Sequence, residues 1–397
     1  MSLLLTALTN EGKLITLLGE MREQVIQLRK HQRFFCPACK EALILKAGHV
    51  RIPHFSHRHH SQCKNTTSEP ESSKHLKGKQ DLFEWCRSNR LDVSLERYLP
   101  DIKQRPDLLV EKDGEQFAIE FQCTPISVHA VDKRSKRYLA QGITPIWIVG
   151  GLPFHKRRAS EMFELTEYHW SLTFRNQENV ILAGYEPESG IVSLLSNITL
   201  YTPRKVFARL KKMPLPMIKF PLPIVDKLDL PLERWFNEKQ KWVQQKVRYG
   251  NLVTDPFLKA VYMDGSNPFL LSPLIGLPVV YMEIFLSHSV EWQFFIWTDC
   301  LAKLKPHKKI SLKYVNYKLR KRIAKGDLVC RVLPLHEENK WEKAVCAYFR
   351  LLEDLFYFQK TGKDLYRMVR DLPRPNHIEE VGLQTEEILV KWMEYRC

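Results

Sequence analysis

Two apolar segments joined by a tight turn form the clearest pattern of hydrophobic and polar positions along this chain of 397 residues. The first segment ends with residues 108–110, and the second covers residues 118–122. Asp113-Gly114 lies between them. An Asp-Gly pair favours a two-residue turn between antiparallel strands. The pattern therefore predicts a β-hairpin.

An acidic residue interrupts the apolar pattern of each segment. Because side chains alternate between the two faces of a strand, Glu120 and Gln122 are expected on one face, opposite to Ile119 and Phe121. Pairing of the hairpin would bring Asp107 and Glu120 to one end of a sheet. Two carboxylates with a polar neighbour can hold a hard divalent cation through oxygen, and such a cation can activate water against a phosphodiester.

The elements around the hairpin predict a mixed α/β core. Early acids and a proline indicate a helix that begins near Glu69 and ends near Asn89. A strand is expected over residues 93–99, before the hairpin. A helix over residues 127–140 and a buried strand over residues 144–149 are expected after it. The predicted order is therefore helix, three strands, helix and strand.

This arrangement resembles the PD-(D/E)xK nuclease superfamily, whose core has an acid after a proline, a turn, and then acid-x-lysine on the next strand. The matching residues here are Pro106-Asp107 and Glu120-x-Gln122, with glutamine in place of the lysine. Gln122 can orient a water molecule through hydrogen bonds, but it brings no positive charge. The superfamily often adds an acid from the first core helix, and Glu71 fits that position.

A closer resemblance is to the CoiA competence family of Gram-positive bacteria. The motifs that carry it are Glu71-x-x-x-His75-x-x-x-Lys79, which forms one polar stripe of a helix, Ile119-Glu120-Phe121-Gln122, Ile146-Trp147-Ile148, Cys36-Pro37-Ala38-Cys39 and His54-Phe55-Ser56-His57. The resemblance is looser in the C-terminal half. It implies a cytoplasmic protein that acts on incoming DNA during natural transformation, in the recombination step.

The resemblance also implies roles for individual residues of the core. Asp107 and Glu120 would bind Mg²⁺ or Mn²⁺, and Glu71 would complete or buffer that site. His75 and Lys79 would contact phosphate or tune the acids. Together with Gln122, these residues make up the predicted catalytic site.

Three of the nine cysteines lie near histidines in the N-terminal region, and this grouping predicts a zinc site. Thiolates and imidazoles in closely spaced pairs suit tetrahedral zinc, and a short ribbon gains much of its stability from the metal. The preferred ligands are Cys36, Cys39, His54 and His57. The substitutes for a ligand position are Cys63, His59 and His60.

Composition favours a polyanionic partner. The chain has 61 Lys and Arg residues against 45 Asp and Glu residues, a formal net charge of +16, which favours nucleic acid first and an anionic membrane second. A membrane-spanning run is not expected, and the apolar N-terminus indicates a hairpin rather than a signal peptide. The other six cysteines are scattered, as expected of reduced thiols in the cytoplasm.

A basic stretch with tyrosines lies in the C-terminal half, where residues 303–326 hold ten Lys or Arg residues and no acid. Basic side chains bind phosphates and aromatic rings stack on unpaired bases, which suits single-stranded DNA. The alternative is a solvated helical face whose tyrosines belong to the core. The expected contacts to nucleic acid are Lys308, Lys309, Lys313, Tyr314, Tyr317, Lys318, Arg320, Lys321 and Arg322.

The pattern divides the chain into five parts. They are a zinc-ribbon-like domain (1–65), a PD-(D/E)xK nuclease-like domain (66–155), a β extension (156–212), a proline-rich extended linker (213–231) and a basic helical domain (232–397). Strands are expected in the β extension at residues 169–174, 180–185 and 191–201. The chain has neither a Walker phosphate loop nor a GxGxxG motif, which argues against a motor ATPase.

The preferred functional hypothesis is metal-dependent processing of single-stranded or branched DNA in natural transformation and recombination. The alternative is a non-catalytic DNA-binding mediator that assists or regulates a recombinase. A third hypothesis is a structural zinc adaptor in a protein complex. The acids separate the first two, because a protein that only binds DNA gains nothing from carboxylates beside phosphates. Salt-sensitive affinity for DNA is expected of the nuclease and of the mediator, but not of the zinc adaptor.

Overall fold

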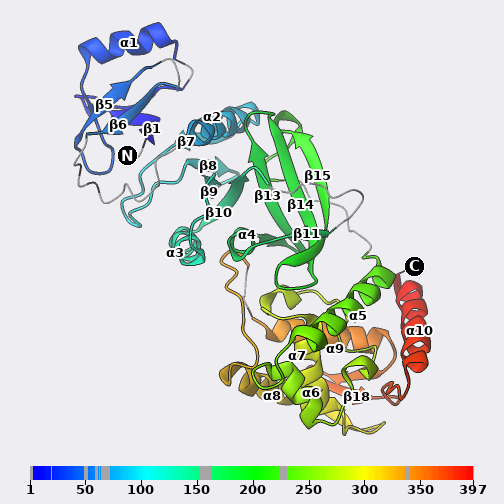
Figure 1. Ribbon diagram of the computed structural model, residues 1–397. Coiled ribbons are helices and arrows are strands. Elements are labelled where there is room, and N and C mark those ends of the chain that lie inside the picture. Colours follow the sequence, from blue (N-terminus) through cyan, green and yellow to red (C-terminus); the bar gives the residue numbers. More distant parts are fainter. Residues whose placement is uncertain are drawn as a thin grey trace.

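The chain folds into three parts that follow one another along the sequence (Figure 1). The computed structural model describes residues 3–18, 20–48, 52–58, 61, 63, 72–152, 162–222, 230–336 and 340–396. The three parts contain sheets of six, nine and three strands, in chain order. The fold is mixed α/β, as the sequence predicts, with most helices in the C-terminal part.

The N-terminal part is a six-stranded sheet with one helix, α1 (Arg22–His31). Its strand order is β1-β6-β5-β4-β2-β3. Strands β2 and β3 form the N-terminal hairpin that the sequence predicts. The strand bounds are β1 Leu3–Leu4, β2 Thr6–Leu8, β3 Leu14–Thr16, β4 Phe34–Phe35, β5 Ala42–Lys46 and β6 His54–His57.

The central part follows the predicted order of helix, three strands, helix and strand. Its first helix is α2 (Ser73–Ser88), and its second is α3 (Val128–Leu139). Further strands extend the sheet to the order β11-β15-β14-β13-β10-β9-β8-β7, with β12 paired to β13. The strand bounds are β7 Asp92–Leu95, β8 Leu108–Lys112, β9 Glu115–Gln122, β10 Ile143–Gly150, β11 Met162–Glu164, β12 Phe174–Asn176, β13 Asn179–Glu186, β14 Ile191–Leu200 and β15 Lys205–Pro214.

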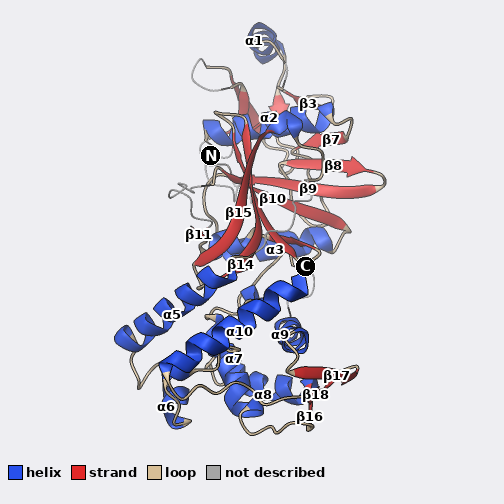
Figure 2. Cartoon of the chain, turned by 90° about the vertical axis from the view of Figure 1, so that its right-hand side faces the viewer, coloured by secondary structure: helices blue, strands red, loops and turns tan. Residues whose placement is uncertain are grey.

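Helices α2 and α3 cover opposite faces of this sheet (Figure 2). Phe121 of β9 packs in one hydrophobic cluster with Leu76 of α2. Ala118 of the same strand packs in another cluster with Tyr138 of α3. The alternation expected for β9 is therefore present, and it gives each helix its own set of side chains from one strand.

Residues 169–174 differ from the expected strand. They form the end of α4 (Glu167–Ser171) and the start of β12. Helix α4 begins there because Thr166 is its N-cap, with a hydroxyl that accepts a hydrogen bond from the backbone N–H of His169 at 3.4 Å. The other two strands expected in this region are confirmed, since β13 and β14 lie where they are expected.

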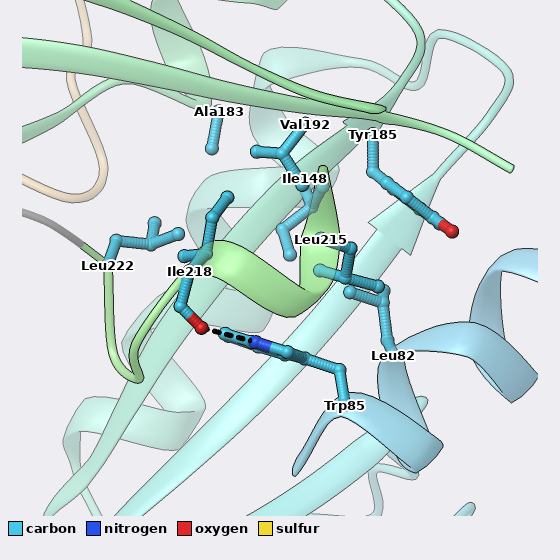
Figure 3. A pocket seen from close by; sticks show the side chains of 9 residues that line it. All are labelled: Leu82, Trp85, Ile148, Ala183, Tyr185, Val192, Leu215, Ile218 and Leu222. Carbon is cyan, nitrogen blue, oxygen red and sulfur yellow. Dashed lines mark hydrogen bonds between the residues drawn. The ribbon is translucent and has the colours of Figure 1, made fainter. Parts of the chain in front are cut away.

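The segment after β15 also differs from the extended connector expected of its prolines. It forms a 3₁₀ turn at Leu215–Met217, and Ile218 and Phe220 are buried against α2. The indole N–H of Trp85 donates to the Ile218 carbonyl oxygen at 2.7 Å and holds the segment in place (Figure 3). Residues 223–229 lie outside the described part of the chain.

A small pocket lies between this segment, α2 and the sheet (Figure 3). Its lining side chains are Leu82, Trp85, Ile148, Ala183, Tyr185, Val192, Leu215, Ile218 and Leu222. The Tyr185 hydroxyl donates to Asp81 at 2.8 Å. The lining is apolar and aromatic, so the pocket offers no group for binding a metal or activating water.

The C-terminal part is mostly helical and also contains a three-stranded sheet of order β16-β18-β17. This small sheet was not expected from the sequence. None of the described helices is long and apolar enough to cross a membrane. The bounds are α5 Leu232–Tyr249, α6 Pro256–Met263, α7 Ser289–Ile296, β16 Lys309–Ser311, α8 Leu312–Ala324, α9 Glu342–Asp354, β17 Phe358–Gly362, β18 Leu365–Met368 and α10 Ile378–Arg396.

The C-terminal part is anchored to the central part by Arg331, which is 3 % exposed. Its guanidinium pairs with Glu167 of α4 at 2.9 Å and donates to the Glu283 carbonyl oxygen at 2.7 Å. It also lies 4.4 Å from the ring centre of Trp170. Trp170 belongs to the same hydrophobic cluster as Trp292 of α7, so the two parts share one core.

Gly78 lies where α2 packs most closely on β9, and a Cβ atom there would lie 2.0 Å from Cε1 of Phe121. In an open helix, Ala is favoured over Gly by about 1 kcal/mol. Here the added methyl group must displace the Phe121 ring, so we expect Gly78→Ala to lower the free energy of unfolding by about 1–3 kcal/mol. Denaturant unfolding would measure the change.

The matched control is Gly382→Ala in α10, where, apart from the adjoining backbone of the helix, no atom of the described residues lies within 4 Å of the new Cβ. This variant should be as stable as the unmodified protein or slightly more stable. Equal stability of both variants would contradict the close packing of α2 on β9.

Candidate active site and metal site

The β8–β9 hairpin places the two predicted acids opposite each other. Leu108 pairs with Ile119, so continuing the register by one residue brings Asp107 opposite Glu120. Asp113 and Gly114 have φ values of 52° and 81°, as a two-residue turn with both central residues in the left-handed region requires. The predicted hairpin and its register are therefore present.

The Asp107 carboxylate is held from the α2 side. It accepts a hydrogen bond from the backbone N–H of Phe121 at 2.8 Å, and its Oδ2 lies 3.4 Å from Nε2 of His75. Nζ of Lys79 lies 3.9 Å from Oδ1. Burial works to raise the pKa of Asp107, but His75, Lys79 and the Phe121 N–H outweigh it and hold that pKa well below its usual range. Asp107 is therefore ionised at neutral pH.

The Glu120 carboxylate faces α3 instead. It is 2 % exposed and accepts hydrogen bonds from the Tyr138 hydroxyl and the Arg134 guanidinium. Burial raises the pKa of Glu120 to about 7; Arg134 opposes the shift and the Asp107 carboxylate adds to it. The two acids therefore differ strongly in proton affinity, and Glu120 takes up a proton near neutral pH.

These two carboxylates could supply oxygen ligands to a hard divalent cation. Asp107 is already ionised, and its charge helps to raise the pKa of Glu120. A bound cation would relieve that repulsion, and it would compete with Arg134 for the Glu120 oxygens. Arg134 would then be available for another anion.

Gln122 follows Glu120 on the same face of β9, as expected from the alternation of side chains. Its amide nitrogen donates to the carbonyl oxygen of Thr124 at 2.8 Å, in the loop after the strand. Glu71, the predicted acid from the first helix, lies outside the described residues. The described part of α2 begins at Ser73, because the Ser72 side chain caps it by accepting from the His75 backbone N–H at 3.1 Å.

Sequence reasoning missed three residues that bind the side chains of the predicted site. Arg134 and Tyr138 lie four residues apart on α3, and this spacing on the helix after the hairpin was the signal that could have identified them. Glu96 follows β7, is 1 % exposed and forms an ion pair with Lys79. The local sequence around Glu96 gives no comparable signal, because its partners are distant along the chain.

A group of cysteine and histidine side chains in the N-terminal part could hold a metal ion. The ligand atoms of Cys36, Cys39, His57 and Cys63 all lie within 4.8 Å of one another. Cys36 and Cys39 lie in the turn after β4, and His57 ends β6. Burial raises the pKa of the Cys39 thiol to about 12, so its thiolate would form together with a bound cation. Three thiols and one imidazole are a donor set suited to zinc.

His54, one of the preferred zinc ligands, is not part of this group. Its Nδ1 lies 2.9 Å from the carbonyl oxygen of Ile52. The structure instead places Cys63, which the sequence offered as a substitute, beside the other three. The spacing of the motif did not reveal this because the chain turns back after β6. His59 and His60 lie outside the described residues.

The basic stretch of the C-terminal part divides into two sets of side chains. Arg322 pairs with Asp299 at 2.7 Å and with Asp327 at 3.1 Å, so it is held within the fold. Arg320 pairs with Glu342 at 3.1 Å. The acids that pair with these two arginines lie outside the basic stretch. The sequence pattern therefore overstated how much positive charge is available to bind phosphate.

The other set forms an exposed face on α8, which we call the tyrosine face. Its rings are Tyr314, 46 % exposed, and Tyr317, 52 % exposed. Lys318 lies 5.5 Å from the ring centre of Tyr314, and Lys321 lies 4.5 Å from that of Tyr317. Lys313 precedes them and is also exposed, as are Lys308 and Lys309 before the helix.

Comparison with known proteins agrees with this architecture. Three family models match successive parts of the chain: the N-terminal domain of competence protein CoiA over residues 17–66, its nuclease-like domain over residues 71–224 and its C-terminal domain over residues 230–381. A Bacillus subtilis (strain 168) protein described as competence protein CoiA is 29 % identical over 299 residues, which cover 73 % of this chain and 78 % of that protein. No solved structure matches. The matches follow the family's domain order over most of the sequence, and the chain therefore belongs to the CoiA competence protein family.

Proposed function

We propose that this protein processes incoming DNA during competence as a nuclease dependent on Mg²⁺ or Mn²⁺. The observation that carries the proposal is the pair Asp107 and Glu120, which lie opposite each other in the register of β8 and β9 and have opposite pKa shifts. Both residues lie in the segment that matches the nuclease-like domain. A buried pair of acids with one proton to lose is suited to taking up a divalent cation.

In this proposal, Asp107 and Glu120 hold the cation, which when bound would lower the pKa of a water molecule and polarise a phosphoryl oxygen. Gln122 orients the attacking water through its amide. His75 and Lys79 keep Asp107 ionised, and Glu71 completes or buffers the site. Arg134, once Glu120 binds the cation, supplies the positive charge that the superfamily's lysine would otherwise bring.

The second candidate is a DNA-binding mediator without catalysis, acting with a recombinase. The tyrosine face favours it, because exposed rings among lysines bind single strands without any need for the acids. In both cases we propose single-stranded or branched DNA as the partner, together with recombination proteins, in the cytoplasm. We also propose the division into the domains 1–65, 66–155 with its extension to 212, and 232–397.

For the N-terminal part we propose a structural zinc ion bound by Cys36, Cys39, His57 and Cys63. Its role would be to fix the chain around β4, β5 and β6 and to add to the hydrophobic cluster that these strands share. A zinc adaptor alone would not account for the two acids of the central part.

The nuclease proposal predicts that Asp107→Asn or Glu120→Gln lowers cation-dependent cleavage at least about a hundredfold, the loss typical of removing one electrostatic contact to a transition state. Both variants should stay folded, because the amide keeps the size of the acid and an oxygen that can accept from the Phe121 N–H or the Tyr138 hydroxyl. Gln122→Lys should preserve or raise cleavage. The assay is cleavage of labelled single-stranded and branched DNA with Mn²⁺ or Mg²⁺.

Glu111→Gln is the matched control, since Glu111 lies exposed on the same hairpin. It should cleave like the unmodified protein. Should the unmodified protein bind no cation in the central part, and Glu120→Gln and Gln122→Lys change no activity on DNA, the nuclease proposal would be wrong and the mediator would take its place.

The tyrosine face predicts that Lys318→Ala with Lys321→Ala weakens binding of single-stranded DNA and lowers the salt slope by about 1.4, at about 0.7 for each phosphate contact. Tyr317→Ala should weaken binding to single strands more than to duplex, because stacking needs unpaired bases. Fluorescence anisotropy across a salt series measures both effects. The control pair is Lys241→Ala with Lys259→Ala, two exposed lysines on α5 and α6. An equal loss in the control would show that only net charge matters.

The zinc proposal predicts about one zinc ion per chain, because four ligands make one tetrahedral site. Cys63→Ser should lower the zinc content and the thermal stability of the N-terminal part. His54→Ala should keep the zinc, since His54 is outside the group of ligands. Elemental analysis of the purified proteins decides between the two ligand sets. If Cys63→Ser keeps the zinc and His54→Ala loses it, the ligands are those expected from the sequence, with His54 in place of Cys63.

A further inference from the structure

We propose that Glu96 is a positioning residue through which the N-terminal part controls the cation site at Asp107. Glu96 follows β7 and is 1 % exposed. Its φ of 48° lies in the left-handed region, so the backbone is held in an unfavourable conformation to place this side chain. The effect on cation binding rests on the proposed function, whereas the network around Glu96 does not.

One oxygen of Glu96 is bound by the N-terminal part. Its Oε2 accepts hydrogen bonds from the backbone N–H of Leu5 at 2.9 Å, from that of Thr6 at 3.3 Å and from the Thr6 hydroxyl at 3.2 Å. Leu5 is fully buried and packs in the hydrophobic cluster that also contains Leu76 of α2. The N-terminal part therefore completes the hydrogen bonding of a carboxylate that belongs to the central part.

The other oxygen of Glu96 binds Lys79, whose side chain is fully buried. The same ammonium group lies 3.9 Å from Oδ1 of Asp107, and the backbone N–H of Glu96 donates to the Asp107 carbonyl oxygen at 3.0 Å. A buried ammonium needs an anion. Glu96 is the nearer anion, so less of the ammonium charge is directed at Asp107. Without Glu96, Lys79 would pair more closely with Asp107.

A short path also joins Glu96 to the group of metal ligands in the N-terminal part. Leu4 of β1 pairs with Phe55 of β6, and β6 ends at His57, one of the four ligands. Leu5 and Thr6 follow β1 directly. A metal that fixes β6 therefore also fixes the two backbone N–H groups that hold Glu96. The structural metal and the cation site are coupled through one strand pair and one carboxylate.

The first experiment measures Mn²⁺ binding to the full chain by calorimetry. Glu96→Gln should weaken binding about tenfold, a typical size for the coupling between neighbouring charges, because Lys79 then pairs with Asp107 and the cation must displace it. Adding Lys79→Met to Glu96→Gln should restore the affinity to within about threefold. Rescue by a second substitution separates positioning from a loss of folding. Glu186→Gln is the control, since it breaks another ion pair of α2, the one between Glu186 and Lys74.

The second experiment follows hydrogen exchange of the Leu5 and Thr6 amides without Mn²⁺, and so does not depend on the cation site. Glu96→Gln should speed their exchange at least about tenfold, and removal of the structural metal by a chelator should do the same and also speed exchange around Asp107. Thr6→Val, which removes one of three hydrogen bonds, should give a smaller change in a protein that folds. Glu186→Gln should leave these amides unchanged.

Unchanged exchange at Leu5 and Thr6 in both Glu96→Gln and Thr6→Val would overturn the proposal. So would weak Mn²⁺ binding in Glu96→Gln that Lys79→Met does not restore. If the unmodified protein binds no Mn²⁺ but the exchange results are as expected, the nuclease proposal fails and Glu96 remains the link between the two parts.

Discussion

The candidate site depends on the register between β8 and β9. A slip of one residue would turn Glu120 to the α2 face and move a neighbouring apolar side chain to the α3 face. The turn at Asp113-Gly114 prevents the slip, because both residues lie in the left-handed region that closes a two-residue hairpin. Glu120 therefore meets the charges of α3, while Asp107, which lies just before β8, meets those of α2.

This division explains how two acids at one end of a sheet differ so much in their affinity for protons. Each lies among different partners: imidazole and ammonium groups for Asp107, a phenol and a guanidinium for Glu120. Burial affects both, but only Asp107 gains enough opposing charge to overcome it. A helix on each face of the sheet thus gives the two carboxylates different affinities for protons.

Much of the fold and of the candidate site could be predicted from the sequence, wherever the signal is local. The hairpin, the order of elements in the core and the cysteine pair depend on neighbouring residues, and each is present. Features that depend on distant partners could not be predicted. Glu96 meets Leu5 and Lys79 only in the folded chain, Cys63 joins its group only after the chain turns back, and Asp299 binds Arg322 from another helix. The helix at α4 was missed because Thr166, its N-cap, outweighed strand propensity.

Arg331 has a consequence for how the molecule could handle a long polymer. Because this buried arginine and a shared core fix the C-terminal part on the central part, the tyrosine face and the acid pair keep a constant separation. The two surfaces are then held by one rigid body, so they do not move apart. A strand held at both places would be contacted at a set number of nucleotides from its bound end, whatever its sequence.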